Sequence, residues 1–282
     1  MKEAIAILTG GGPAPGMNTV VGSVAKTFLR KGYRVIGLHE GYTGLFNPSP
    51  RTVDIDYPMA DGIFNQGGSF LQMSRFKPKD SDFENNFNLK FFTDNNIKLL
   101  VTVGGDDTAS TANRIAKFLE AKKYPIANIH VPKTIDNDLW GTQVTFGFQS
   151  AMNIAVEVID SIHSTAFSHS RVFIVEIMGH KAGWLTLHAG IASGADVIVI
   201  PEIPYDARAI AAAIQQRARE GKRFSIVAVA EGAISREEAA MSKKDFKAAR
   251  AAMPYPSISY RLADELQKIT SQETVSYTHL RA

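Results

Sequence analysis

Cysteine is absent from the 282 residues, which excludes a disulfide framework and any thiolate metal site and suits a reducing compartment. Long hydrophobic runs are absent as well. No apolar stretch approaches the roughly 20 residues that span a bilayer, and the run after Lys2 is too short for a signal-peptide core. Large charge excess is also missing, since the formal net charge is only +3. We therefore predict a cytoplasmic protein with no nucleic-acid partner and no membrane partner.

The composition is that of a globular protein, with 45% hydrophobic and 21% charged residues. At this length the chain fits one large or two medium domains. Short apolar runs alternate with segments of helical periodicity along the whole chain. This order of elements predicts the α/β class, in two similar halves with a boundary near Trp140.

A glycine-rich stretch, residues 10–18, follows an apolar strand and precedes a helix of regular period. Backbone N–H groups at such a helix start can face an anion. The known nucleotide motifs do not fit, because Met17 and Asn18 replace the Lys-Ser/Thr of a P-loop and Pro15 replaces the third Rossmann glycine. A tight turn alone is the alternative, but three consecutive glycines favour close approach of the backbone to a ligand.

A second polar stretch, Gly104-Gly-Asp-Asp-Thr108, ends a buried apolar strand and opens another helix. Open α/β sheets bind ligands at the carboxyl ends of their strands. Two adjacent carboxylates there are costly without a cation, so Asp106 and Asp107 indicate Mg²⁺ shared with a phosphate. The alternative is helix capping. We expect one of the two carboxylates to cap the helix and the other to face the ligand.

A third stretch, residues 131–138, reads Val-Pro-Lys-Thr-Ile-Asp-Asn-Asp. Pro132 should stop the preceding strand because it has no N–H to donate. Asp136 and Asp138 are two residues apart and would point to the same side of an extended segment, as shared work on a metal or a proton requires. Lys133 and Thr134 add donors for an anion. An acidic surface turn is the alternative.

Arg75 follows a second glycine pair at residues 67–68. A guanidinium in this context could clamp a phosphate through two parallel hydrogen bonds. It could equally be a surface charge, and the local sequence does not decide between the two.

Together these loops resemble the phosphofructokinase family in order and spacing. The resemblance continues through Glu176-Ile-Met-Gly-His-Lys-Ala-Gly-Trp184, Pro201-Glu202 and Ala230-Glu231-Gly232. It implies two Rossmann-like α/β domains with the active site between them, and a glycolytic phosphotransferase acting on fructose 6-phosphate. The implied division is a phosphoryl-donor domain at residues 1–140, a sugar-phosphate domain at 141–255, and a helix returning toward the first domain within 256–282.

Two positions distinguish the phosphoryl donor. ATP-dependent members read Gly-Gly-Asp-Gly and Pro-Gly-Thr-Ile-Asp-Asn-Asp, whereas this chain has Asp107 and Lys133 in place of the variable glycines. That pair resembles the pyrophosphate-dependent branch. An aspartate side chain would intrude on the path of a nucleoside, and a lysine suits a compact tetra-anion. The alternatives are an ATP-dependent enzyme and a non-catalytic phosphate-binding or regulatory subunit.

The resemblance also implies a role for individual residues. Asp136 would be the general base, with Lys133, Thr134 and Asp138 completing the catalytic set. Asp106 would hold Mg²⁺, the one expected cofactor. The expected donor contacts are Gly11, Arg75, Asp107, Thr108 and Lys133. The expected fructose 6-phosphate contacts are Thr134, Asp136, Arg171, Met178, Gly179 and Glu231. Arg171 would reach a sugar phosphate in a neighbouring subunit, which implies a homo-oligomer, either a dimer or a tetramer.

The C-terminus departs from the family pattern. Relatives continue into a Leu-Gly-x-x-Gln-Arg-Gly-Gly segment and then a histidine and an arginine that grip the sugar phosphate, whereas here Glu273-Thr274 is followed by Val-Ser-Tyr-Thr-His-Leu-Arg-Ala. We expect these last eight residues to be non-native and the chain to be C-terminally truncated. The sugar-phosphate pocket would then be incomplete, which keeps the non-catalytic alternative open.

Overall fold

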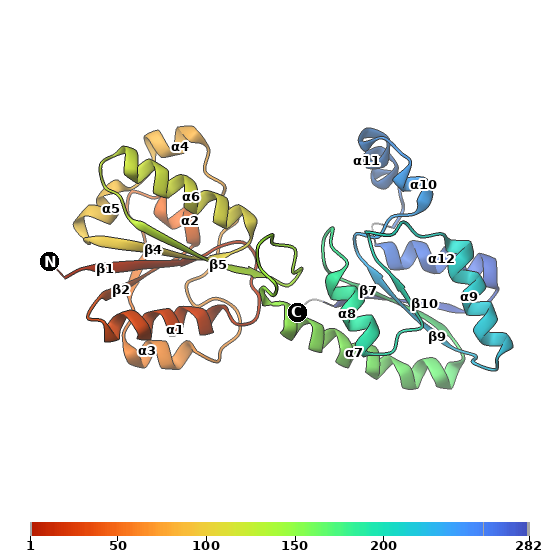
Figure 1. Cartoon of the computed structure of the whole chain (residues 1–282). Coiled ribbons are helices and arrows are strands. Elements are labelled where there is room, and N and C mark those ends of the chain that lie inside the picture. The colour runs from red at the N-terminus through yellow and green to blue at the C-terminus, as the bar shows by residue number, and fades with distance from the viewer. Residues whose placement is uncertain (1, 256, 281–282) are drawn as a thin grey trace. The chain divides into compact units, whose positions relative to one another are not determined.

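The computed structural model describes residues 2–255 and 257–280, which form two compact units (Figure 1). Unit 1 contains the residues up to Thr134 together with Leu139–Gly147. Unit 2 contains Ile135–Asp138 and the residues from Phe148 onward. The chain therefore passes between the units after Thr134, again after Asp138 and again after Gly147. No helix among the described residues has the length and apolar character needed to span a membrane.

Unit 1 is built on a six-stranded sheet with the order β3-β2-β1-β4-β5-β6. Its strands are β1 (Ala4–Thr9), β2 (Arg34–Leu38), β3 (Thr52–Asp54), β4 (Ile97–Gly104), β5 (Ala127–Thr134) and β6 (Phe146–Gly147). All neighbours pair in parallel except β2 and β3, which are antiparallel. Because β1 lies in the interior of the sheet and both its faces are covered, every residue of that strand is buried.

Helices cover both faces of the unit 1 sheet (Figure 1). They are α1 (Met17–Arg30), α2 (Gly41–Leu45), α3 (Tyr57–Ile63), α4 (Asp80–Asn85), α5 (Leu89–Asp94) and α6 (Asp106–Ala121). The alternation of β1 assigns Ile5 and Ile7 to the core with α1 and α3, and assigns Leu8 to the core with α6. Phe83, Phe91 and Phe92 are buried in that second core, and Phe87 packs against it.

Unit 2 has a parallel sheet with the order β10-β7-β9-β8. The strands are β7 (Val172–Ile177), β8 (Val197–Val199), β9 (Ser225–Ala230) and β10 (Thr274–Leu280). One core involves α7 (Phe148–His169) and α8 (Trp184–Ala192); the other involves α9 (Ala207–Arg219) and α12 (Ile258–Thr270). Two further helices, α10 (Arg236–Ala239) and α11 (Lys243–Ala251), project from this unit. The predicted α/β class is confirmed.

The C-terminal residues belong to unit 2. We expected a helix here that returns toward the first domain, and the structure has α12 packed in unit 2 through the buried Leu262 and Leu266. Strand β10 then extends the sheet beside β7. The segment expected to be non-native begins within β10 at Val275, and its last two residues, 281 and 282, lie outside the described residues.

Two local predictions are wrong. Strand β5 runs through Pro132, which stands opposite Gly104, because the next residue continues the sheet by pairing with Phe146 of β6. The segment after Thr134 is a bend and not extended, because Asn137 has a left-handed φ of 53°.

Candidate active site

The predicted donor loops of unit 1 lie at one edge of its sheet. Strands β1, β4 and β5 are parallel neighbours, so their carboxyl ends meet there. The N–H of Gly10 donates to the carbonyl of Val103 at 2.9 Å, and the N–H of Gly11 donates to that of Ser74 at 3.1 Å. The glycine loop is therefore tied on one side to the end of β4 and on the other to the segment that carries Arg75.

Thr108 is the residue around which the first two loops close. A Cβ atom at Gly10 would lie 2.6 Å from Thr108 Oγ1, and one at Gly104 would lie 2.6 Å from Thr108 Cβ. The Tyr42 hydroxyl donates to the Thr108 carbonyl at 2.7 Å. Thr108 itself is buried. Thr108 therefore packs the glycine loop against the end of β4. Its predicted contact with the phosphoryl donor stays a prediction.

Lys133 and Arg75 place two cations beside the glycine loop. Lys133 is 5% exposed, and its Nζ donates to the Gly12 carbonyl at 2.6 Å. Arg75 is exposed, with Nη2 3.7 Å from the position that a Cβ atom of Gly12 would occupy. Gly11 has a φ of 84°, a conformation that favours glycine. The structure therefore brings Gly11, Arg75 and Lys133 together, and their charges suit an anionic ligand.

The two carboxylates of the second loop lie in the first turn of α6. The N-cap is Gly105, with no side-chain cap, so the expectation that Asp106 or Asp107 caps the helix is wrong. Both are exposed at the positive end of the helix dipole, which favours negative charge. Asp107 Oδ2 is 2.6 Å from Lys77 Nζ. Sequence reasoning missed Lys77, because nothing local connects it to a residue 30 positions later.

The carboxylate ligands at this edge of the sheet could bind a hard metal cation only together with phosphate oxygens of a substrate. Within the described ranges there is no group of three or more His, Asp or Glu side chains that could hold a metal by themselves. Mg²⁺, however, is commonly bound by one or two carboxylates, waters and substrate phosphate oxygens. The exposed carboxylate of Asp106, beside a loop suited to anions, fits that mode.

His130 is a second residue that sequence reasoning missed. Its Nε2 lies 3.0 Å from the carbonyl of Gly104, and its Nδ1 lies 2.9 Å from Thr102 Oγ1. Burial lowers the pKa of His130 below its ordinary value of 6.5 and outweighs the opposing hydrogen bond to Gly104. Because a carbonyl only accepts, the neutral ring donates from Nε2 to Gly104 and accepts at Nδ1 from the threonine hydroxyl.

The third loop is divided between the units. Lys133 and Thr134 are the last residues of β5 in unit 1, whereas Asp136 and Asp138 belong to unit 2. Asp136 is half-buried and Asp138 is exposed. The bend at Asn137 removes the alternation on which the sequence argument for a shared face rested.

Unit 2 brings three of the six predicted sugar-phosphate residues, Met178, Gly179 and Glu231, together where β7 and β9 end. Glu231 Oε1 accepts from the N–H of His180 at 2.6 Å and from that of Gly179 at 3.3 Å. Gly179 has a φ of 152°, and a Cβ atom there would lie 2.5 Å from the Ala182 carbonyl oxygen. Met178 directly precedes it. Arg171 lies before the start of β7 and pairs with Glu273 at 2.8 Å, so it is not part of this group.

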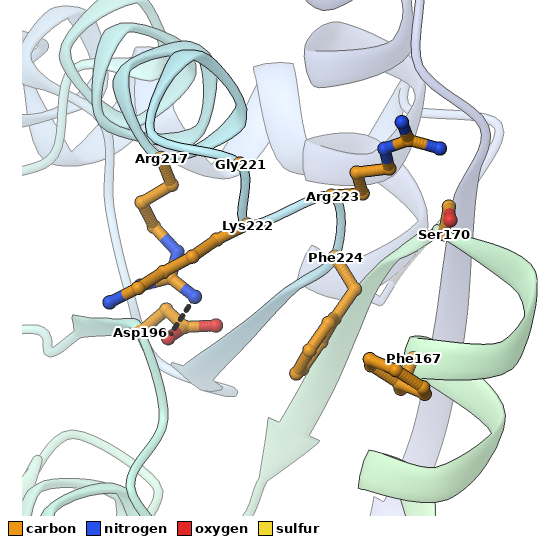
Figure 2. Close-up of a pocket in the computed structure, with 8 residues that line it drawn as sticks. All are labelled: Phe167, Ser170, Asp196, Arg217, Gly221, Lys222, Arg223 and Phe224. Atoms are coloured by element: carbon orange, nitrogen blue, oxygen red, sulfur yellow. Dashed lines mark ion pairs between the residues drawn. The ribbon is translucent and has the colours of Figure 1, made fainter.

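A separate pocket of 560 Å³ lies where β9 begins and holds none of the predicted site residues. Arg217 pairs with Asp196 at 2.7 Å, and Figure 2 shows Lys222 beside them. The rings of Phe167 and Phe224 meet edge to face at a centroid distance of 6.0 Å on another side of the pocket.

The structure defines an α/β protein with two cationic side chains beside a glycine loop at one sheet edge, and comparison with known proteins identifies the family. Residues 4–281 match the family model described as Phosphofructokinase. The chain belongs to the phosphofructokinase family.

Individual relatives differ in the donor that their names state. The chain is 45% identical over 281 residues to an ATP-dependent 6-phosphofructokinase of Spirochaeta thermophila, covering 95% of this chain and 74% of that protein. It is 38% identical over 275 residues to a pyrophosphate–fructose 6-phosphate 1-phosphotransferase of Streptomyces coelicolor, covering 95% and 77%. The solved phosphofructokinase of Saccharomyces cerevisiae superposes with a TM-score of 0.82 at 29% identity, covering 98% of this chain and 37% of that one.

Proposed function

We propose that this protein transfers a phosphoryl group from pyrophosphate to the 1-hydroxyl of fructose 6-phosphate, reversibly, giving fructose 1,6-bisphosphate and phosphate. The observation that carries the choice of donor is the position of Lys133. The Lys133 ammonium lies 2.6 Å from the Gly12 carbonyl, at the glycine loop. By the family resemblance, members that use ATP have a glycine in place of Lys133. A lysine there adds positive charge against the donor without leaving extra room for a nucleoside.

Asp107 also supports pyrophosphate as the phosphoryl donor, because it disfavours a nucleotide. Its side chain stands in the first turn of α6, and Lys77 pairs with its carboxylate. A carboxylate at this position would repel the α-phosphate of a nucleotide and occupy space along the path of the nucleoside. Pyrophosphate, which has neither group, meets Lys133 and Arg75 on the glycine-loop side.

The reaction requires one base and a set of donors that neutralise charge. Asp136 would take the proton of the 1-hydroxyl as its oxygen forms a bond to phosphorus and the bond from phosphorus to the leaving phosphate breaks. Lys133 and Arg75 would neutralise charge on the donor, with Thr134 and Asp138 orienting the loop. When bound with Asp106, Mg²⁺ would neutralise phosphate charge.

A second candidate uses ATP as the donor. The observation that favours it is the name of the Spirochaeta thermophila relative, which is ATP-dependent and more similar in sequence than the Streptomyces coelicolor protein. Against this stands the presence of both Asp107 and Lys133 in the chain. A non-catalytic phosphate-binding subunit is the third possibility, and retention of Asp106, Lys133 and Asp136 argues against it.

The test measures formation of fructose 1,6-bisphosphate from fructose 6-phosphate and Mg²⁺, with pyrophosphate or ATP supplied in parallel. The double variant Asp107→Gly, Lys133→Gly is assayed beside the parent protein, with its folding checked by urea unfolding. We expect turnover with pyrophosphate in the parent and a shift toward ATP in the variant. Turnover with ATP alone in the parent would overturn the donor assignment. Binding of pyrophosphate without turnover would favour the non-catalytic alternative.

We further propose a cytoplasmic homo-oligomer, a dimer or a tetramer. The support for assembly is Arg171, which lies apart from the other sugar-phosphate residues of its own chain, as an arginine that serves a neighbouring subunit would.

A further inference from the structure

A cavity of 680 Å³ lies beside the predicted sugar-phosphate residues of unit 2. One part of its wall comes from the ends of β7 and β9 and includes Lys181 and Glu231. Another part comes from α10 and α11 and includes Lys243 and Phe246. None of the motifs that carry the family resemblance lies in this second part.

The helices α10 and α11 are held in place by polar contacts at their base. Glu238, which is buried, pairs with Arg250 at 2.6 Å and with Arg261 at 3.2 Å. Arg250 also donates to the carbonyl of Ala233 at 3.0 Å. A reciprocal cap between Ser235 and Glu238 starts α10. The orientation of α11 relative to the cavity is therefore specified.

Helix α11 has no buried residue. It projects from the rest of unit 2 (Figure 1). Burial of apolar surface is the main source of stability for a helix on a globular protein. Helix α11 is held by the ion pair between Arg250 and the buried Glu238, yet none of its own residues is buried. Its position therefore contributes to the cavity wall rather than to the hydrophobic core.

The carboxylates and the lysines around the cavity differ in the partners that they already have. Each of its carboxylates already has protein donors: Glu176 accepts from the hydroxyls of Ser257 and Ser259, Glu231 accepts from two backbone N–H groups, and Glu238 pairs with arginines. Lys181 and Lys243, in contrast, form no ion pair with any residue that the structure describes. Two ammonium groups without an ion-pair partner, one on each of these two parts of the wall, favour an anionic ligand.

We propose that α11 forms one wall of the pocket for the phosphate acceptor and that Lys243 binds the phosphate group of the sugar monophosphate. The identity of the ligand rests on the proposed function, whereas its anionic character rests on the cavity. Lys243 is the first residue of α11, so its stem starts from a fixed helix and its ammonium is free to reach the ligand. It would supplement the contacts expected from Gly179 and Glu231.

The test compares Lys243→Met with Lys244→Met, because Lys244 is the adjacent residue of the same helix and does not line the cavity. We expect Lys243→Met to raise KM for fructose 6-phosphate about tenfold, the effect of losing one hydrogen bond to a charged group. KM for the phosphoryl donor should stay within about twofold, and Lys243→Arg should restore most of the affinity. Equal kinetics for Lys243→Met, Lys244→Met and the parent would overturn the proposal.

Direct binding separates this proposal from the proposed function. Titration calorimetry with fructose 6-phosphate, in the absence of any phosphoryl donor, is performed on the parent and both variants. If the parent does not turn over but binds the sugar phosphate, a loss of binding confined to Lys243→Met supports the role of Lys243 although the catalytic assignment has failed. If the parent does not bind fructose 6-phosphate at all, or if both variants bind as the parent does, the proposal is wrong.

Discussion

The side chain of Thr108 determines how closely the glycine loop, residues 10–18, and the loop after β4 pack together. Gly104 has an ordinary strand conformation, so it needs no special φ, yet a Cβ atom there would lie 2.6 Å from Thr108 Cβ. The clash involves a rigid part of the threonine and cannot be relieved by rotating a flexible chain end. A glycine at this position is therefore a packing requirement of the candidate site and not only a feature of its backbone.

Gly104→Ala should accordingly destabilise the protein by about 1–3 kcal/mol, the usual cost of overpacking. The matched control is Gly62→Ala on helix α3, where a Cβ atom meets nothing within 4 Å. That change should be neutral or stabilise by up to about 1 kcal/mol, because alanine favours helix more than glycine does. Urea unfolding of the two variants measures both values, and equal stabilities would contradict the packing argument.

A second prediction at the residue scale concerns pH. Burial lowers the pKa of His130 in the folded protein, whereas the unfolded chain titrates near the ordinary value of 6.5. As pH falls below that value the unfolded chain binds the proton first, so the free energy of unfolding decreases. Above pH 6.5 the ring is neutral in both states, and His130 causes no such loss of stability. Replacement by glutamine, which cannot titrate, should remove this part of the pH dependence.

Urea unfolding of the parent and of His130→Gln between pH 5 and pH 8 tests this. His39 also has a pKa lowered by burial, so the comparison with the parent, rather than the slope of either protein alone, isolates the contribution of His130. Parallel stability curves for the two proteins would show that His130 is not the source.

At the scale of elements, helix α12 shows how a cap can come from far away in the sequence. Its N-cap, Ser257, makes no local cap, and the hydroxyls of Ser257 and Ser259 donate to Glu176 instead. The N–H of Ser259 donates to the same carboxylate at 3.1 Å. A negative charge at a helix start also interacts favourably with the helix dipole. Glu176 thereby ties the C-terminal helix to strand β7.

Glu176→Ala should lower the free energy of unfolding by about 1–3 kcal/mol, since it leaves buried donors without an acceptor. Glu157→Ala on the exposed side of α7 is the control and should change stability by less than about 0.5 kcal/mol. Thermal unfolding of both variants provides the measurement. A similar, small effect for the two would mean that α12 does not depend on this cap.

The sequence predicted most long elements and the location of the three loops, because apolar period and glycine placement are local properties. It failed where the deciding partner is distant. Strand β5 continues through Pro132 because Phe146 pairs with the next residue, and that pairing has no local signature. Lys77 and His130 escaped for the same reason, since their partners, Asp107 and Gly104, lie 30 and 26 positions away.

At the scale of the whole molecule, the proposed assembly makes its own prediction. Arg171 pairs with Glu273 of the same chain and lies apart from Glu231. If it serves a neighbouring subunit, sedimentation analysis should show a dimer or tetramer. Arg171→Met should then raise KM for fructose 6-phosphate while the sedimentation coefficient stays unchanged. A fully active monomer would contradict both parts, and a monomeric variant would mean that Arg171 acts in assembly instead.

The repeated passage of the chain between the units has a consequence for catalysis that follows from covalent geometry alone. Lys133 belongs to unit 1 and Asp136 to unit 2, but only two residues separate them. The Cα atoms of Lys133 and Asp136 therefore cannot be more than about 11 Å apart in any arrangement of the two units. One residue inserted after Thr134 would raise this maximum Cα–Cα distance between the proposed donor-binding lysine and the proposed base by about 3.5 Å.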